Sequence, residues 1–156
     1  CSSDLGPFSP ERAGSLPLEG IIRMARSEKY TDIEDLFKKL TKDSGVKGYL
    51  GTGDMREVME MVNEGDKKVT LIYKAMIYQI AKEIGAMSTT MKGQVDRIIY
   101  TGGMAYNNRI VTDLHDRVKF IADKIVFPGE NELESLAEGG FRAVDGEAEI
   151  KTYKQQ

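Results

Sequence analysis

Two glycine-rich loops carry residue types from which nucleotide-binding sites are built. The one further along the chain, called the second loop, lies in RIIYTGGMAYNN, where Gly102 and Gly103 follow an apolar run and precede an amphipathic segment. Glycines at such a turn let a ligand approach the backbone, and the N–H groups at the start of the next helix suit a nucleotide. The loop lacks the third glycine of a dinucleotide fingerprint and the lysine of a phosphate loop. Taken alone, it favours a tight corner between a strand and a helix.

The one nearer the amino terminus, KGYLGTGDMRE, called the first loop, runs into a predicted helix whose start holds Asp54 and Arg56. A carboxylate at this place can accept hydrogen bonds from a ribose, and an arginine can stack on a base. Capping of the helix by Asp54, with Arg56 in solvent, is the more common arrangement. The residues of this loop therefore favour capping unless a second observation points to a ligand.

Further charged side chains have possible chemical roles, each with a simpler alternative. In PGENELE, Glu130 and Glu132 follow a predicted strand, where a carboxylate can reach a metal ion at the edge of a sheet. Acidic residues also favour helix starts through the helix dipole. In SPERAG, Arg12 lies on a loop where it can pair with a phosphate or a carboxylate, or simply face solvent. His115 has no second histidine or cysteine at metal-ligand spacing, and we predict a surface position without a catalytic role.

Composition excludes several classes of protein. The chain has 156 residues, of which 40% are hydrophobic and 30% charged, which is typical of a globular domain with one core. Its net charge of -3 argues against a nucleic-acid partner. No apolar run is long enough to span a bilayer, and the single cysteine cannot form an internal disulfide. We expect a cytoplasmic protein with neither a nucleic-acid nor a membrane partner.

Apolar periodicity predicts helices on both sides of the glycine-rich interruption SGVKGYLGTGD. The expected helices are a short one within 17–30, one opened by Thr31 with Ile33, Leu36, Phe37 and Leu40 on its apolar face, and the segments 55–64, 66–92, 107–121 and 132–144. Thr31 is the expected N-cap of the second segment, with Glu34 completing a capping box, and Asp54 is the expected N-cap of the third. The segment 66–92 is expected to be the central helix, and the last segment to close the domain.

Two short runs, RIIYTGG and KIVFPGE, are rich in β-branched and aromatic residues and end in glycine. The helix predicted between them makes this a βαβ unit with parallel strands. A parallel sheet of two strands is poorly supported by itself, so we expect more strands in sequence that this chain lacks.

Five motifs, taken in order, resemble the carboxy-terminal part of the butyrate-type enzymes in the acetate kinase group of acyl kinases. The motifs are GPFSPERAGSLP, YLGTGDMREV, AMIYQIAKEIGAM, TGGMAYN and FPGENELESLAEGGFR. Among them, SPERAG and PGENELE distinguish the butyrate-type enzymes from acetate kinase itself. The resemblance covers nearly everything after Leu5. Residues 6–156 are thus expected to be the nucleotide-binding half, and residues 1–5, CSSDL, look like a translated sequencing adapter and a non-native leader.

The resemblance implies a fold and an activity. The fold is α/β: a helix-rich, partial RNase H-like domain of the actin-like ATPase kind, with a small parallel sheet and strands missing through truncation. The activity is a direct in-line transfer of phosphate between ATP and butyrate, giving butyryl phosphate and ADP, with Mg²⁺ required. This chain is expected to supply the adenosine-binding wall and to be inactive alone. Members of the group commonly assemble through this half, so a homodimer or a higher homo-oligomer is expected.

The resemblance also implies roles for individual residues. The residues expected to bind the nucleotide are Asp54, Met55, Arg56, Gly102, Gly103, Met104 and Asn107. In the second loop, Ala105 and Tyr106 stand where acetate kinase typically has a Gly-Glu pair. Glu130 and Glu132 are candidates for the metal site, and Arg12 is the candidate catalytic arginine.

Two alternative functions stay open from the sequence. One is a kinase of the same group that acts on acetate, propionate or a branched-chain fatty acid, because the pocket that measures chain length is not visible in these motifs. The other is a noncatalytic nucleotide-binding or interaction domain, which the many predicted helices would also permit.

Overall fold

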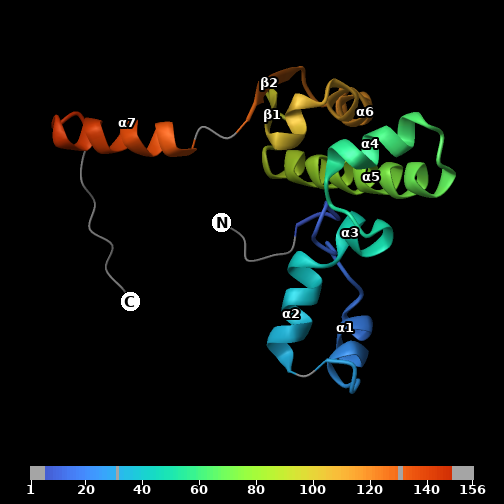
Figure 1. The fold of residues 1–156 in the computed structure, drawn as a ribbon. Helices are drawn as coiled ribbons and strands as arrows, with labels where there is room; N and C mark the ends of the chain where they lie inside the picture. Colours follow the sequence, from blue (N-terminus) through green and yellow to red (C-terminus); the bar gives the residue numbers. More distant parts are fainter. Residues whose placement is uncertain (1–5, 31, 130–131, 149–156) are drawn as a thin grey trace.

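The computed structural model describes residues 6–30, 32–129 and 132–148 (Figure 1). The expected leader, residues 1–5, and Glu130 lie outside these ranges. The elements are α1 (Leu18–Ala25), α2 (Ile33–Lys42), α3 (Gly45–Leu50), α4 (Met55–Asn63), α5 (Lys67–Thr90), β1 (Ile98–Gly102), the 3-10 helix η1 (Gly103–Tyr106), α6 (Asn108–Val118), β2 (Lys124–Pro128) and α7 (Glu132–Val144). The predicted helix-rich α/β fold with a small parallel sheet is confirmed. Within the described ranges, no helix is both long and apolar enough to cross a membrane.

The sheet consists of β1 and β2, which pair in parallel with Ile98 opposite Lys124 and Gly102 opposite Pro128. Side chains alternate along β1, so that Ile98 and Tyr100 are buried while Ile99 is exposed. The helix α6 connects the two strands, which confirms the predicted βαβ unit. One face of β1 therefore belongs to the core and the other is open.

The helix α5 lies at the centre of the packing, as predicted. Tyr73, Met76 and Ile77 on this helix are almost completely buried. Three other helices, α3, α4 and α6, contact it, and the side chains that they bury most completely are Val46, Val58 and Val118. Burying one such side chain contributes about 1.5–3 kcal/mol to stability. The packing of these helices against α5 therefore stabilises the fold.

A partly buried hydrogen bond joins α5 to α6. Tyr73 is only 1% exposed, and its hydroxyl donates to Asp113 Oδ2 over 2.7 Å. Burial, together with the hydrogen bond to Asp113, raises the pKa of Tyr73. Arg109, in the first turn of α6, donates to Asn63 Oδ1 at the end of α4. These bonds link three helices that apolar contacts already hold together.

The glycine-rich segment predicted as a loop contains the short helix α3. Its first N–H groups find acceptors far away in sequence: Val46 donates to the carbonyl of Ser9 over 3.0 Å, and Lys47 to that of Pro10 over 2.9 Å. Gly45 has a φ of 63°, a conformation that favours glycine. The amino-terminal loop thus caps α3, an arrangement that local sequence does not reveal.

Three further expectations need correction. The N-cap of α2 is Asp32 and not Thr31, because Asp32 Oδ1 accepts the N–H of Asp35 over 2.8 Å. Threonine and aspartate are both good N-caps, so preference alone does not resolve a shift by one residue. The helix α6 ends at Val118 and does not reach residue 121. Finally, α7 does not close the domain but extends away from the other elements (Figure 1).

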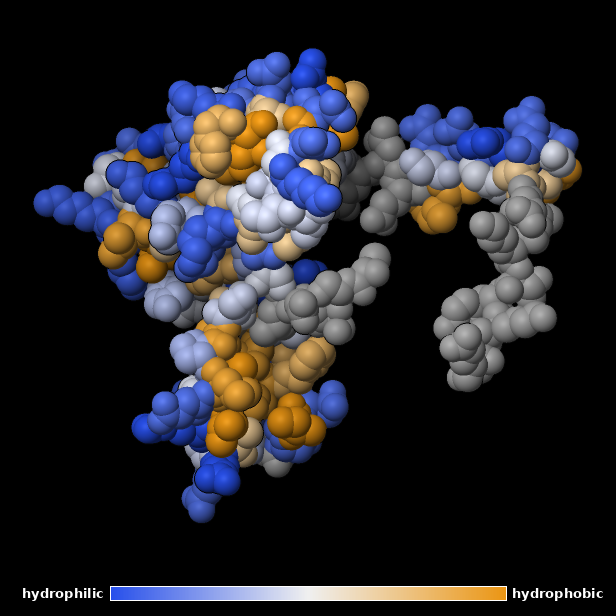
Figure 2. Space-filling model, turned by 180° about the vertical axis from the view of Figure 1, so that it is seen from behind, coloured by the Kyte–Doolittle hydropathy of each residue, from blue (hydrophilic) through white to orange (hydrophobic). Residues whose placement is uncertain are grey.

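Apolar side chains gather on the outer surface of the α1–α2 lobe, at the bottom of the molecule (Figure 2). Leu18 and Ile22 of α1 and Ile33 and Phe37 of α2 are exposed there. Of the face predicted for α2, only Leu36 and Leu40 are buried. The α1–α2 lobe therefore presents a surface that nothing in the described residues covers.

Gly45 gives a direct test of the contact between the amino-terminal loop and α3. A Cβ at this position would lie 2.1 Å from the carbonyl oxygen of Ser9, on a backbone with positive φ. We expect Gly45→Ala to lower the free energy of unfolding by about 2 kcal/mol or more. Gly48→Ala in the same helix is the matched control, because its Cβ would meet no atom closer than 3.5 Å. It should raise stability by up to about 1 kcal/mol. Equal urea denaturation midpoints for the two variants would contradict this account.

Candidate functional site

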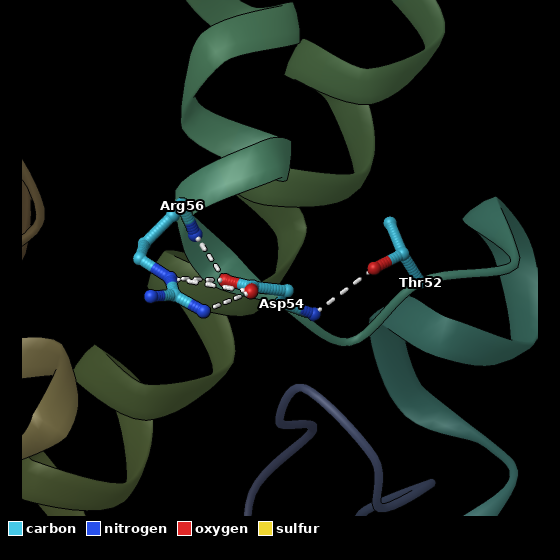
Figure 3. Close-up of polar contacts among 3 residues, drawn as sticks. All are labelled: Thr52, Asp54 and Arg56. Carbon is cyan, nitrogen blue, oxygen red and sulfur yellow. Dashed lines mark hydrogen bonds and ion pairs between the residues drawn. The ribbon is translucent and has the colours of Figure 1, made fainter.

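Asp54 caps the helix α4, as predicted (Figure 3). Its Oδ1 atom accepts the backbone N–H of Arg56 over 2.9 Å. Its own N–H donates to the Oγ1 atom of Thr52 over 3.1 Å. The glycine-rich loop is thereby fixed on both sides of Asp54, and α4 starts at a defined position.

The same carboxylate accepts three hydrogen bonds from the Arg56 side chain, two from Nε and one from Nη2 (Figure 3). Arg56 Nε donates to Asp54 Oδ1 over 3.0 Å, and Nη2 donates to Oδ2 over 2.6 Å. The Arg56 side chain is 89% exposed, whereas that of Asp54 is 32% exposed. A carboxylate binds a guanidinium at its edge, so this pairing orients Arg56 and leaves the flat faces of its guanidinium free. Hydrogen bonds from the Arg56 side chain and backbone lower the pKa of Asp54 to about 2.

The second glycine-rich loop leads from β1 through η1 into α6. Asn107 is the N-cap of α6, and its Oδ1 atom accepts the N–H groups of Arg109 and Ile110 over 3.0 and 3.2 Å. Gly102 has a φ of 82°. Its N–H donates to the carbonyl of Gly129 over 3.1 Å, and its carbonyl accepts the N–H of Gly129 over 3.2 Å. The loop is therefore held at both ends by hydrogen bonds.

The two loops meet at one hollow of about 490 Å³ on the surface of the molecule. Its lining residues are Met55, Arg56, Gly103, Met104, Tyr106, Asn107 and Ile110. Five of the seven predicted nucleotide-binding residues are among them. The other two predicted residues, Asp54 and Gly102, are sequence neighbours of lining residues. Asp54 binds the Arg56 side chain, and Gly102 is hydrogen-bonded to Gly129. The hollow has the size of a small-molecule site.

Sequence reasoning missed Tyr106 and Ile110 as lining residues. Ile110 follows Asn107 by one helical turn, so the position of the N-cap could have indicated it. Tyr106 was noticed only as a departure from the acetate kinase pattern. Its exposed ring gave no periodic signal in the sequence.

Arg12 does not reach the hollow. Its backbone N–H donates to Ser9 Oγ over 3.1 Å, and its carbonyl accepts the N–H of Ser9 over 3.2 Å, so the loop closes into a compact turn. The Arg12 side chain is exposed. The same turn lies beside the first glycine-rich loop, because a Cβ at Gly53 would lie 3.3 Å from Glu11 Cγ. Arg12 is thus near that loop but outside the hollow's lining.

Glu130 and the side chain of Glu132 lie outside the described residues. Within the described ranges, no group of three or more histidine, cysteine, aspartate or glutamate side chains is arranged to hold a metal ion. Gly129, the last described residue before Glu130, is hydrogen-bonded to Gly102 at the end of β1.

His115 is partly buried and not fully on the surface, which corrects the prediction. The edge of its ring meets the ring of Tyr100, and Nδ1 lies 3.4 Å from the Tyr100 hydroxyl. It does not line the hollow. These contacts join α6 to β1 and fit a structural role.

Comparison with solved structures identifies the fold as that of the acetate kinases. The acetate kinase from Entamoeba histolytica matches with a TM-score of 0.75 and 22% identity, covering 90% of this chain and 44% of that one. A propionate kinase from Francisella tularensis matches with a TM-score of 0.70 and 19% identity, covering 82% of this chain and 38% of that one. The expected kind of fold is therefore confirmed.

Sequence comparison gives the family. Residues 10–147 match the acetokinase family, and the chain belongs to this family. Butyrate kinase 1 from Clostridium acetobutylicum is 50% identical over 149 residues, which are 96% of this chain and 42% of that protein. A probable butyrate kinase from Clostridium botulinum is 46% identical over 148 residues, covering 95% of this chain and 41% of that protein. The chain thus spans about two fifths of the length of these curated relatives.

The pairing of Asp54 with Arg56 predicts an acid-resistant carboxylate. The pKa of Asp54, followed by the chemical shift of its carboxyl carbon, should be about 2 in the parent chain. In Arg56→Ala it should rise toward the ordinary value of 3.8. Because the folded-state pKa is lowered, this pairing stabilises the fold above the unfolded pKa of about 3.9, and the contribution is lost as the pH falls through about 2. Arg26→Ala, at the end of α1, is the control and should leave Asp54 unchanged. An Asp54 pKa near 3.8 in the parent chain would refute the pairing in solution.

Proposed function

We propose that this chain is the adenosine-binding part of an acyl kinase that transfers phosphate between ATP and butyrate, giving butyryl phosphate and ADP. The observation that carries the proposal is the hollow at which Arg56 and Asn107, from two separate loops, come together. Membership of the acetokinase family supports the reaction type. The two curated relatives that match most of this chain are named as butyrate kinases, which supports the substrate.

Arg56 is proposed to stack on the adenine base with a free face of its guanidinium. Asp54 keeps the guanidinium oriented, and its carboxylate is the proposed contact for a ribose hydroxyl. Met55 and Met104 supply apolar contacts in the hollow. Their flexible thioethers adapt to the edge of a flat ligand.

The second loop is proposed to follow the nucleotide with its backbone. Gly103 and Asn107 line the hollow, and at Gly103 there is no atom within 4 Å of the position that a Cβ would occupy. A ligand can therefore come close to the main chain there. Gly102 is proposed to act through the turn that it forms at the end of β1.

Butyrate is the proposed substrate, and acetate, propionate and a branched-chain acid are the alternatives within the family. The proposal includes Mg²⁺, with Glu130 and Glu132 as candidate ligands, and Arg12 as the candidate arginine for charge neutralisation during transfer. The bound metal ion would supply neutralisation of phosphate charge. The described residues offer no alternative metal group. A noncatalytic nucleotide-binding role is the second candidate, since the hollow would serve it equally.

We also propose that the intact protein is a cytoplasmic homodimer or a higher homo-oligomer. The exposed apolar side chains of the α1–α2 lobe support this, because a second copy of the chain would remove them from water (Figure 2). Phe37 and Ile33 form the α2 part of this surface.

Replacing Arg56 tests the nucleotide site in the intact enzyme. Arg56→Ala should raise the KM for ATP about tenfold, because a stacked cation contributes about 1–2 kcal/mol to binding. The kcat should change by less than about threefold, since stacking on the base is the same before and during transfer. Arg26→Ala is the control for loss of a positive charge elsewhere. An unchanged KM for ATP would remove Arg56 from the site.

This chain alone should make no acyl phosphate, although it should still bind ATP. It spans 42% of its relative, and the phosphate-facing wall is proposed to lie in the rest of the enzyme. The measurement is hydroxylamine trapping of butyryl phosphate formed from ATP, Mg²⁺ and butyrate, with a full-length relative as positive control. Butyryl hydroxamate above the background of a boiled sample would contradict the prediction.

A further inference from the structure

Tyr106 is the aromatic residue of the hollow. Among the described residues that line it, Tyr106 alone carries an aromatic ring, and this residue is 71% exposed. It ends η1, directly before the N-cap Asn107. An exposed ring at the wall of a hollow has a free face with which a flat ligand can stack.

The outer end of this ring is seated on the backbone of Gly129. A Cβ at Gly129 would lie 2.5 Å from the Tyr106 hydroxyl oxygen and 3.3 Å from Cζ, so the ring occupies the space that a side chain would need. Gly129 has a φ of 98° and exchanges two backbone hydrogen bonds with Gly102. Thr101 Oγ1 also donates to the Gly129 carbonyl over 3.3 Å. The Gly129 backbone, on which the ring packs, is therefore held in place. This contact restricts the orientation of the Tyr106 ring although the residue is exposed.

The hollow thus offers two flat groups from different elements, the guanidinium of Arg56 at the start of α4 and the phenol of Tyr106 at the end of η1. Apolar atoms of Met104 and Ile110 lie along the same wall. Flat π systems and thioethers suit an aromatic heterocycle, and the cation among the lining residues, Arg56, is already paired with Asp54 and so is less available to a phosphate. The chemistry of this wall suits a nucleobase.

We propose that Tyr106 stacks on the base of the bound nucleotide and is a base-contact residue of this site. The inference rests on the proposed nucleotide-binding function and adds a residue to it. Stacking does not read the hydrogen-bonding edge of the base, so Tyr106 strengthens binding without selecting among purines. Gly129 is then a positioning residue, because it leaves room for the ring.

The chain contains no tryptophan, which makes Tyr106→Trp a single-site reporter. ATP should change its emission in a saturable way, and tripolyphosphate, which lacks a base, should not. The matched control is Tyr78→Trp on α5, half-exposed and outside the hollow, whose emission ATP should leave unchanged. Equal responses to ATP and tripolyphosphate would overturn the inference.

Affinity gives the second measurement, by calorimetry of this chain with ATP. Tyr106→Ala should raise the dissociation constant about tenfold, as expected for the loss of one stacked ring, while Tyr106→Phe should recover most of the affinity. Gly129→Ala keeps the ring but displaces it, and should weaken ATP binding in the same direction. If Tyr106→Ala lowers only the denaturation midpoint and not the affinity, the ring is merely structural and the inference is wrong. If the parent chain binds no ATP at all, the proposed function fails together with it.

Discussion

The packing of α4 and α6 on α5 is the constraint on which the candidate site depends. Both helices bury apolar faces against the central helix, and both begin at the hollow, α4 after Asp54 and α6 after Asn107. The separation of the two loops is therefore set by apolar contacts that lie away from the hollow. The bond from Tyr73 to Asp113 and that from Arg109 to Asn63 restrict sliding between these helices. The positions of the two loops that line the hollow are thus set by packing in the core.

The use of the helix N-termini indicates which part of a nucleotide this wall suits. The N–H groups at a helix start attract anions when they are free. Here Asp54 accepts the N–H of Arg56, and Asn107 accepts those of Arg109 and Ile110. The carboxylate also places a negative charge at the start of α4, which disfavours a phosphate beside it. Flat and apolar groups then dominate the hollow, which fits the nucleoside better than the phosphates.

The sequence predicted best those elements whose ends carry their own signals. Asp54 and Asp66 cap α4 and α5, and both helices lie close to the expected bounds. The helix α3 was not predicted, because the groups that cap it are carbonyls of the amino-terminal loop and no local sequence pattern reveals them. For α7, the sequence predicted the helix but not its lack of packing, since amphipathic spacing says which face is apolar and not what covers it.

The candidate site shows the same limit. Periodicity and spacing favoured a simple corner at Gly102 and simple capping at Asp54, and only the ordered motifs of the family assigned these loops to one site. The structure then brought Arg56 and Asn107 to one hollow. Tyr106 could not be predicted, because the position of its ring depends on the bare backbone of Gly129 after the next strand. Contacts between residues far apart in sequence are what single-sequence patterns omit.

The exposed apolar side chains of the sheet and of α7 are not among the residues that line the hollow. Ile99 and Phe127 lie exposed on the sheet, and Leu133 and Phe141 on α7, although parallel sheets normally have both faces covered. The two loops, in contrast, are fixed by α5 and by the bonds between Gly102 and Gly129, all within this chain. The wall proposed for the nucleoside therefore does not depend on whatever covers the open sheet. The proposed binding of the base is therefore separable from phosphate transfer, and its proposed contacts all lie within this chain.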